Sequence, residues 1–340
     1  MSYIIPFLIA FALTVIFTFL VIFLTKKIKW SGRKSLRHIH QTNISRLGGL
    51  IMIIVFDLVV LTTKDLFITP QLYGFLVGNI LLLAVCFVDD LKELRWKVQF
   101  FSQVAVTVFV FIMGIRIYYI TNPLTGGIIK LNSGAGVIFS VTLVIFWMIL
   151  LMNAINWIDG IDGLSGGIAF ITVATIFFLS FYSEVNQPPV AIICSILMGT
   201  ILGFLIFNFY PSRIIAGTTG AIFMGFSLAV LAIFAGTKIA TSVLVLAIPI
   251  IDFFWVIRER IRNKKSIFIP DKNHLHYKLL DLGWSQRKIV LAYWSVTAII
   301  AFVALNTRVI GKGITLILVA IVMIIVISVI NKKISKLNEK

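Results

Sequence analysis

The chain alternates long apolar runs with short polar segments. Runs of about 17–25 apolar residues are long enough to cross a bilayer as helices. The pattern predicts an all-α integral membrane protein, a polytopic bundle of about eleven transmembrane helices that forms a single domain over residues 1–340. The expected spans lie near residues 4–25, 46–64, 70–88, 98–117, 136–153, 164–183, 189–208, 219–235, 239–257, 288–305 and 313–331.

Basic side chains are divided unevenly between the two sets of loops that these helices define. Of the 30 Lys and Arg residues, 24 fall in one set of loops and in the tail after residue 331. Cytoplasmic loops are enriched in Lys and Arg, so this set is expected to be cytoplasmic, with the N-terminus outside and the C-terminus in the cytoplasm. Its loops are residues 26–46, 89–97, 153–164, 209–218 and 258–288.

Composition agrees with a membrane protein. Hydrophobic residues make up 60% of the chain and charged residues 13%, whereas soluble domains contain roughly 45–50% apolar residues. The net charge of +17 is explained by the basic cytoplasmic loops and by attraction to anionic lipid head groups. Membrane lipids are therefore expected partners, and no nucleic-acid binding is needed to account for the charge.

The most unusual polar stretch lies between two apolar runs. It holds two amides and two carboxylates: Asn153, Asn156, Asp159 and Asp162. Charge is expensive beside hydrocarbon, so these acids must be solvated, paired or bound to a cation. A glycine follows each aspartate and permits a tight turn and the close approach of a ligand. A polar loop with ordinary turn residues is the simpler alternative.

Adjacent acids, Asp89 and Asp90, end the third apolar run, and Lys92 follows them. Mg²⁺ is usually bound by one or two carboxylates together with substrate phosphates, and neighbouring carboxylates raise each other's proton affinity, which suits a base. A charged helix end in the head-group region is the alternative. Arg46 precedes a Gly-Gly pair, where it is placed either to contact an anion at a helix start or simply to contribute to the basic loop.

Other polar segments lie on the same predicted face. The segment from Asn208 to Thr218 includes Arg213 and opens a helix with glycine and threonine, which is a weak sign of an anion-binding turn. His274 and His276 are two residues apart, so they do not share a helical face and fit an extended or turning segment. Such a pair ligates a metal or binds a diphosphate, although a lone His-x-His is more often chance.

Some features have no assigned chemistry. The external loop 118–136 is predicted to form a small β-hairpin around residues 122–127. Asp57 and Asp252 lie within apolar runs, where an acid should face the bundle interior or water. The sequence offers no partner for either acid.

The order of these motifs resembles a known family. The motifs are Arg46-Leu-Gly-Gly49, Asp89-Asp90, Asn156-Trp-Ile-Asp159-Gly-Ile-Asp162-Gly, Asn208-x-x-Pro211 and Asp271-x-x-His274-x-His276. Together they are similar to the polyprenyl-phosphate N-acetylhexosamine-1-phosphate transferases, bacterial membrane enzymes of glycosyltransferase family 4 that start peptidoglycan, O-antigen lipopolysaccharide and teichoic acid synthesis. The His-x-His segment resembles the branch that uses UDP-N-acetylglucosamine or a related sugar.

The resemblance implies transfer of a sugar-1-phosphate from a UDP-sugar to undecaprenyl phosphate, with release of UMP, at the cytoplasmic face of the bacterial inner membrane. It implies Mg²⁺ as cofactor, with Mn²⁺ as the alternative. A homodimer is one assembly that it allows. Catalytic roles fall on Asp89, Asp90, Asp159 and His274, and metal binding falls on the first three of these. The implied substrate-binding residues are Arg46, Lys92, Asn156, Asp162, Asn208, Arg213, Lys272 and His276.

The chain departs from the family pattern at two sites. Thr218 stands where the family has an aspartate that helps to hold magnesium, with Ala221 in place of a serine, and Gln99 stands where many members have a lysine. A neutral hydroxyl is a poorer magnesium ligand than a carboxylate. Two alternatives therefore stay open: a catalytically weak or inactive relative that binds lipid phosphate or a nucleotide sugar, and an unrelated membrane transporter.

Overall fold

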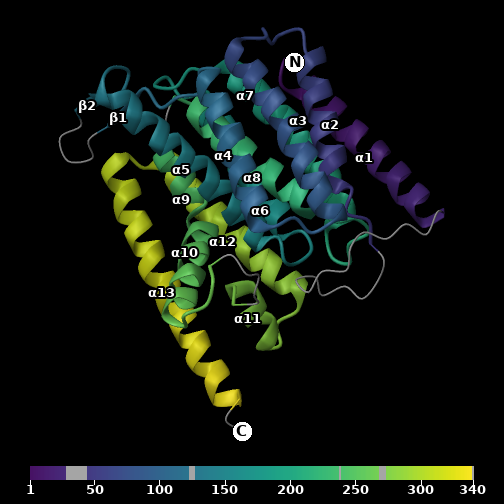
Figure 1. Ribbon diagram of the computed structural model, residues 1–340, viewed down its shortest axis with the longest axis vertical. Helices are drawn as coiled ribbons and strands as arrows, with labels where there is room; N and C mark the ends of the chain where they lie inside the picture. The colour runs from purple at the N-terminus through teal and green to yellow at the C-terminus, as the bar shows by residue number, and fades with distance from the viewer. Residues whose placement is uncertain (28–43, 122–126, 237–238, 268–272, 339–340) are drawn as a thin grey trace.

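The structure is a computed structural model that describes residues 1–27, 44–121, 127–236, 239–267 and 273–338. Helices form most of this part of the chain, accompanied by one two-stranded sheet (Figure 1). In chain order the helices are α1 (Ile4–Lys27), α2 (Gly48–Thr62), α3 (Pro70–Leu91), α4 (Trp96–Ile112), α5 (Ala135–Ile158), α6 (Leu164–Leu179), α7 (Pro188–Asn208), α8 (Gly217–Phe234), α9 (Ile239–Val245), α10 (Ala247–Arg262), α11 (Leu275–Asp281), α12 (Gln286–Asn306) and α13 (Val309–Asn338).

Each apolar run expected from the sequence is helical over most of its length. Among the described helices, seven are long and apolar enough to span a membrane, or eight if the bent pair α9 and α10 forms one span. Helices α2, α4 and α6 are apolar but shorter. The protein is therefore a helical, multi-pass membrane protein, while the number of eleven crossings stays a prediction.

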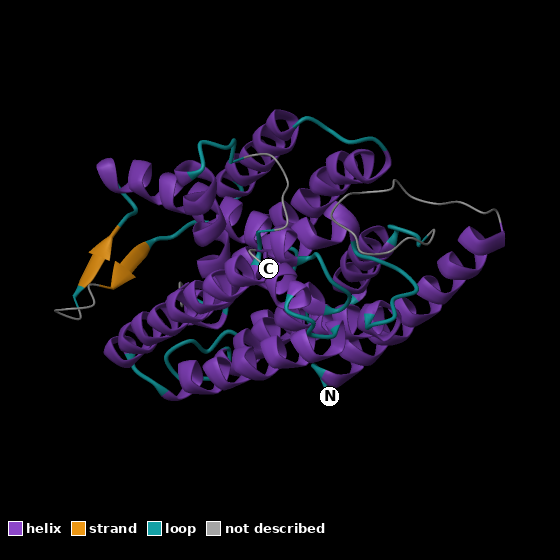
Figure 2. Ribbon diagram, turned by 90° about the horizontal axis from the view of Figure 1, so that it is seen from below, coloured by secondary structure: helices purple, strands orange, loops and turns teal. Residues whose placement is uncertain are grey.

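Local features of the fold both extend and confirm the expected pattern. The run expected at 239–257 is broken, because α9 and α10 are bent by 73°. The loop expected at 258–288 contains the short helix α11. The hairpin expected in loop 118–136 is confirmed: β1 (Tyr119–Thr121) pairs antiparallel with β2 (Ile128–Lys130), and Figure 2 shows this sheet projecting from one side of the bundle. Its place outside the membrane stays a prediction.

The helices differ greatly in how much of their surface they bury. Within their apolar stretches, α7 and α8 are 83% and 89% buried, whereas α1 and α13 are only 22% and 17% buried. Figure 1 shows α1 and α13 on opposite flanks of the bundle. Their exposed apolar side chains suit contact with lipid tails, because a bilayer solvates such surfaces and water does not.

Glycines let α1 pack closely on α7. A Cβ on Gly199 would overlap the backbone of Phe7, and a Cβ on Gly203 would lie 2.8 Å from the carbonyl oxygen of Phe11. Small residues four positions apart allow helix backbones to approach each other in membranes. This contact attaches the most exposed N-terminal helix to one of the two most buried ones.

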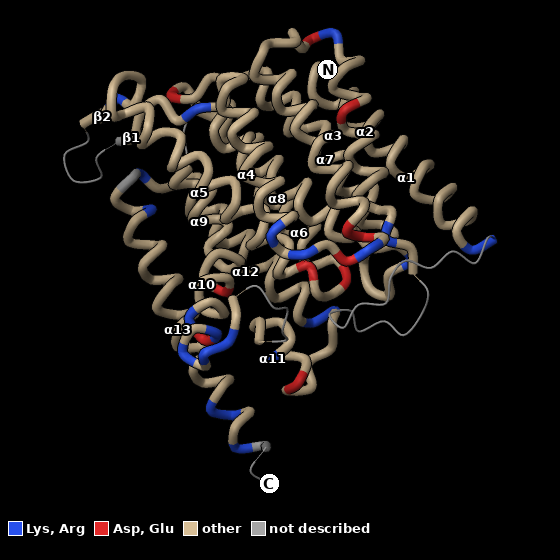
Figure 3. Tube along the Cα trace, viewed as in Figure 1, with Lys and Arg blue, Asp and Glu red and all other residues tan. Residues whose placement is uncertain are grey.

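Charged residues gather toward one end of the bundle. Figure 3 shows most Lys, Arg, Asp and Glu positions in the lower half of the view, where the chain also ends. The segments expected to be cytoplasmic contribute most of these positions. This end of the bundle carries the candidate site.

Candidate active site

Asp90 joins the end of α3 to the start of α8. Its Oδ1 accepts a hydrogen bond from the backbone N–H of Thr218 at 2.8 Å, and its Oδ2 accepts from the N–H and the hydroxyl of Thr219 at 3.0 and 2.7 Å. The free N–H groups at a helix start favour an anion. Gly217 has a φ of 69°, and a Cβ there would lie 2.6 Å from Asp90 Oδ2. Asp90 therefore acts as a buried anchor for α8.

The segment around Arg46 lies beside this anchor. The backbone of residues 45–49 pairs with that of residues 214–216, just before α8. A Cβ on Gly49 would overlap the backbone of α8, so the close approach requires glycine at this position. The pairing brings the Arg46 guanidinium to 3.8 Å from Asp90 Oδ1. A cation is thus held next to the first acid pair.

Asp89 has a different environment. Within the described residues, both of its hydrogen bonds reach Oδ1, from the Leu94 N–H at 2.9 Å and from Gln99 Nε2 at 2.8 Å, and none reaches Oδ2. Gln99, which departs from the family pattern, is therefore a direct neighbour of the expected catalytic acid. Lys92 is exposed on the loop that follows α3.

The loop between α5 and α6 carries the second pair of acids. Asp159 follows the last residue of α5 and accepts a short hydrogen bond from the Ser165 hydroxyl through Oδ1. Asp162 Oδ2 accepts from the Ser212 N–H at 3.0 Å. Gly163, with a φ of 80°, supplies the left-handed turn from which α6 begins.

Asp159 is electrostatically coupled to the first acid pair. Burial raises the pKa of Asp159 to about 6; the hydrogen bond from Ser165 and the charge of Arg46 oppose the shift, and the charges of Asp162 and Asp90 add to it. Asn208 links the acidic loop to Ile214, and residues 45–49 pair with residues 214–216, so the two acidic motifs and Arg46 lie at the same end of the bundle, as these charge effects require.

Asn208 fastens this loop to the end of α7. Its Oδ1 accepts from the Gly163 N–H at 3.0 Å, and its Nδ2 donates to the Ile214 carbonyl at 2.9 Å. Asn208 is buried, so its amide holds the acidic loop in place. Arg213 is exposed. Asn156 is half-buried, and its side chain makes no hydrogen bond with the other described residues.

The histidine segment packs against the same acidic loop. A Cβ on Gly160 would overlap both His276 and Tyr277, so the glycine between the two aspartates permits this contact. His276 is fully buried, and neither ring nitrogen has a hydrogen-bond partner within the described part of the chain. Burial, followed by the proximity of His274, lowers the pKa of His276 to about 3. Lys272 lies outside the described residues.

Asp252, in α10, is the partner of His274. Its Oδ2 lies 2.7 Å from His274 Nδ1, and its Oδ1 accepts from the Leu275 N–H at 2.9 Å. The Trp157 ring lies edge-on to the His274 ring, with centroids 5.6 Å apart. The acid that lacked a partner in the sequence is therefore part of the site.

Several residues of the site were not candidates from the sequence. Ser165 and Thr219 donate hydroxyls to aspartates, and no spacing rule reveals such contacts. Asp252 did carry a signal, because an acid in an apolar run needs a partner. The other such acid, Asp57, accepts a hydrogen bond from Asn79 at 2.7 Å inside the bundle.

The carboxylates do not form a closed metal cage. In the described residues, no group of three or more His, Cys, Asp or Glu side chains comes close enough to hold a metal ion. Both Asp90 oxygens accept hydrogen bonds from α8. In contrast, Asp89 and Asp159 each have one carboxylate oxygen that accepts no hydrogen bond from the described residues. Mg²⁺ needs only one or two carboxylates when substrate phosphates complete its shell. These two acids fit an ion shared with a substrate.

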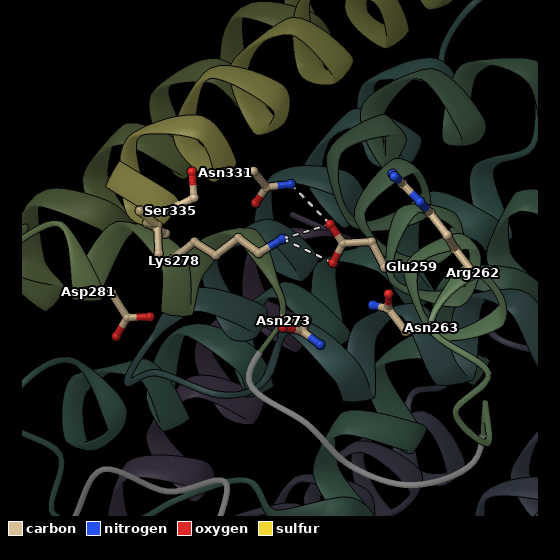
Figure 4. A pocket seen from close by; sticks show the side chains of 9 residues that line it. Glu259, Arg262, Asn263, Asn273, Lys278, Asp281, Asn331 and Ser335 are labelled. Atoms are coloured by element: carbon tan, nitrogen blue, oxygen red, sulfur yellow. Dashed lines mark hydrogen bonds and ion pairs between the residues drawn. The ribbon is translucent and has the colours of Figure 1, made fainter. Parts of the chain in front are cut away.

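A polar pocket of about 430 Å³ lies beside the histidine segment, between α10, α11 and α13. Figure 4 shows Lys278 reaching Glu259 across it. Lys278 Nζ lies 3.2 Å from both Glu259 oxygens, and Asn331 Nδ2 donates to Oε1 at 3.0 Å. None of the residues expected to form the site lines this pocket. Its contacts hold α11 between α10 and α13.

A family model described as "Glycosyl transferase family 4" matches residues 72–236. The matched region runs from α3 to the residues after α8, and it contains the Asp89-Asp90 pair and the loop of Asp159 and Asp162. The match with the family model thus covers the part of the fold that gathers the four acids.

Relatives extend the similarity over most of the chain. A "Probable undecaprenyl-phosphate N-acetylglucosaminyl 1-phosphate transferase" from Bacillus subtilis is 27% identical, covering 99% of this chain and 93% of the relative. A "Decaprenyl-phosphate N-acetylglucosaminephosphotransferase" from Mycobacterium leprae is 29% identical, covering 80% and 75%. A "Phospho-N-acetylmuramoyl-pentapeptide-transferase" from Halalkalibacterium halodurans is 29% identical, covering 89% and 96%.

Fold and site together define a multi-pass membrane enzyme with an acidic site at one end of its helical bundle. The chain is similar to glycosyl transferase family 4, and the family match and the names of the relatives indicate a phospho-sugar transferase. The resemblance expected from the motifs is thereby confirmed.

Proposed function

We propose that this protein transfers a sugar-1-phosphate of the N-acetylhexosamine type from a UDP-sugar to undecaprenyl phosphate. A phosphate oxygen of the lipid attacks the β-phosphorus of the UDP-sugar, the bond from that phosphorus to the bridging oxygen breaks, and UMP leaves. The product is a lipid-linked diphospho-sugar that initiates a cell-envelope polysaccharide. The observation that carries the proposal is the arrangement of Asp90 beside Arg46 and of the Asp159–Asp162 loop fastened to residues 208–214 next to them.

The names of the relatives support the substrate classes. Two relatives are named for undecaprenyl or decaprenyl phosphate and for N-acetylglucosamine, and another for N-acetylmuramoyl-pentapeptide. A polyprenyl phosphate acceptor is common to the first two names. Since the Bacillus subtilis relative matches almost the whole chain, UDP-N-acetylglucosamine is the first donor to test.

Asp89 and Arg46 would act on the acceptor. Phosphoryl transfer requires alignment and charge neutralisation more than covalent chemistry by the protein. Asp89 Oδ2 is the carboxylate oxygen without a hydrogen bond from described residues, and it would orient or deprotonate the lipid phosphate. Arg46, held 3.8 Å from Asp90, would offset the negative charge that two phosphorylated substrates bring.

Asp159 and His274 would act on the donor. Asn156 and Asp159 face the nucleotide in this proposal, while Asp162 and Asn208 hold their loop through bonds to Ser212 and Gly163. His274 would meet the diphosphate or the sugar. His276 is buried beneath it and would support the contact from within.

The remaining predicted cations would attract the substrates rather than position them. Lys92 and Arg213 are both exposed, so their long side chains are free to approach phosphate groups from the solvent. Lys272 is proposed for the diphosphate on the motif alone.

Magnesium, with manganese as the alternative, is proposed as the cofactor. When bound, it would neutralise charge on the donor diphosphate. Asp89 and Asp159 would hold it, because each has a carboxylate oxygen without a partner among the described residues. Asp90 would contribute its charge while anchoring α8.

The site is proposed to face the cytoplasm of a bacterium, with the N-terminus outside the inner membrane. The distribution of Lys and Arg supports this orientation, since the basic loops lie at the end of the bundle that holds the acids (Figure 3). Nucleotide sugars are made in the cytoplasm, so the orientation agrees with the proposed donor.

The test is a transfer assay with purified protein, undecaprenyl phosphate, magnesium and a panel of UDP-N-acetylhexosamines, followed by UMP release. Lipid-dependent UMP from one sugar would establish the reaction and name the donor. No UMP from any sugar, with binding of lipid phosphate or nucleotide retained, would contradict it and favour a relative that has lost turnover. The neutral Thr218 beside Asp90 is the observation that keeps this second candidate in view.

A further inference from the structure

Asp252 is bonded to the histidine segment through both of its oxygens. Oδ1 accepts from the backbone N–H of Leu275 at 2.9 Å, and Oδ2 lies 2.7 Å from His274 Nδ1. Asp252 is 1% exposed and His274 4% exposed, so water does not compete for these contacts. A buried carboxylate with two well-formed hydrogen bonds holds its partners in a defined geometry.

A carboxylate at one ring nitrogen fixes the tautomer and the orientation of an imidazole. The carboxylate of Asp252 can only accept, so the proton of His274 resides on Nδ1. We propose that Asp252 is a positioning residue that keeps this proton on Nδ1, so that Nε2 of His274 presents an acceptor lone pair to the O–H or N–H groups of the donor's sugar. This inference rests on the function proposed above.

The groups around the pair come from four elements. His276 lies parallel to His274 with ring centroids 5.5 Å apart, and Trp157 of α5 closes another side. The guanidinium of Arg260, in α10, lies over the Trp157 ring, 4.7 Å from its centroid. Tyr293 of α12 interacts electrostatically with Asp252, and its hydroxyl has no partner within the described residues. Of the groups that face the pair, only Asp252 forms a hydrogen bond with the His274 ring among the described residues.

The amide variant Asp252→Asn removes the charge at position 252 and changes the tautomer of His274, while the side chain keeps nearly the same size and shape. Asparagine keeps one acceptor and replaces the other with an NH₂ donor. The Leu275 N–H can only donate, so the amide oxygen must face it and the NH₂ must face His274 Nδ1. Nδ1 then has to accept, and the proton moves to Nε2. We expect kcat to fall about 10- to 100-fold, which is the usual cost of losing an orienting partner of a functional histidine.

Glu259→Gln is the matched control. Glu259 is also a carboxylate of α10, and it holds α11 through Lys278 without touching the His274 ring. The same chemical change there loosens the attachment of α11 but leaves the tautomer alone. We expect kcat to change less than about threefold and the ring signals of His274 to stay in place.

The tautomer is read directly from the ¹⁵N shifts of histidine rings in labelled protein. The chain has four histidines, and a His274→Gln variant assigns the signals of this one. The inference predicts an Nδ1–H ring in the wild-type protein and an Nε2–H ring in Asp252→Asn. An Nε2–H ring in the wild-type protein would overturn it without any variant, so a failure of Asp252→Asn to fold does not leave it untested.

Kinetics complete the test. In a His274→Gln background, Asp252→Asn should cause no further loss of kcat, because its effect passes through the ring. Equal losses in Asp252→Asn and Glu259→Gln, with no change of tautomer, would overturn the inference and show that Asp252 only attaches α11. If the wild-type protein releases no UMP, the proposed function fails, yet the ¹⁵N measurement still decides the role of Asp252.

Discussion

Asp89 and Asp90 are adjacent in sequence but have different surroundings. Both oxygens of Asp90 accept hydrogen bonds from the start of α8, and Arg46 lies beside them. Asp89 receives both of its bonds on Oδ1, from the loop after α3 and from Gln99 in α4, and none on Oδ2 within the described residues. One acid completes the fold of the site, and the other keeps an oxygen available for a substrate.

This difference shows that an acidic pair in a motif need not act as a unit. Consecutive residues at a helix end point in directions about 100° apart, so their side chains meet different elements. Asp90 is directed toward α8 and Asp89 toward the loop and α4. The same carboxylate-to-amide change at the two positions therefore tests the comparison directly.

Asp90→Asn should have the largest effect. The amide keeps one oxygen, so its NH₂ group would face the N–H of either Thr218 or Thr219, donor against donor, and Arg46 would lose its nearby charge. Breaking a buried charged contact of this kind costs about 3–5 kcal/mol, so we expect a clear fall in thermal stability in detergent together with loss of transfer. Unchanged unfolding with normal activity would show that Asp90 does not anchor α8.

Asp89→Asn should abolish transfer without destabilising the protein. The Asn side chain can still accept the Leu94 N–H through its oxygen, so the unfolding temperature should remain close to that of the wild-type protein. Loss of an orienting or basic carboxylate should lower kcat by roughly 10²- to 10⁴-fold. Activity near that of the wild type would remove Asp89 from the mechanism and reverse the comparison with Asp90.

Apolar length and charge asymmetry predicted the helical framework well. Each expected run is helical, because a bilayer-length apolar run has few other ways to satisfy its backbone. The bend between α9 and α10 was missed, since the run from Ile239 to Val256 is apolar apart from Thr241, Ser242 and Asp252 and has the length of a single span. The helix α11 was missed because its seven residues lie in a polar loop and show no clear periodicity.

The candidate site was predictable in its acids and less so in their partners. Asp159 and Arg46 carried a sequence signal because charge near hydrocarbon needs compensation. Ser165 and Thr219 did not, since hydroxyls are common in apolar helices. His276 was expected to meet substrate; it packs against Gly160 and is fully buried, and its contact with substrate stays a prediction. Sequence spacing reports which groups are present and not which of them remain accessible after folding.

Asp159→Asn extends the comparison to the second acid pair. One Asp159 oxygen accepts no hydrogen bond from the described residues, and the acid is proposed to face the nucleotide and its metal ion. The variant should therefore lose transfer by about 10²-fold or more while remaining folded. Ser165→Ala is the milder partner: it removes the hydroxyl that donates to Asp159 and should cost about tenfold or less. Both are measured as UMP release, with thermal unfolding as the check on folding. A larger loss in Ser165→Ala than in Asp159→Asn would contradict this ranking.

Thr218→Asp is expected to have the smallest effect on the rate and the clearest effect on metal response. Thr218 lies in the first turn of α8, where a helix start tolerates an added carboxylate. However, its N–H donates to Asp90, so the new carboxylate would be repelled by the negative charge of Asp90. A divalent cation relieves this repulsion, and the magnesium concentration for half-maximal activity should fall about 3- to 10-fold, corresponding to roughly 1 kcal/mol. Magnesium should also raise the unfolding temperature of Thr218→Asp more than that of Thr218→Asn, because asparagine has the size of aspartate but no charge. An identical magnesium response in the two variants would mean that position 218 does not lie beside the metal, and Asp90 would then be an anchor alone.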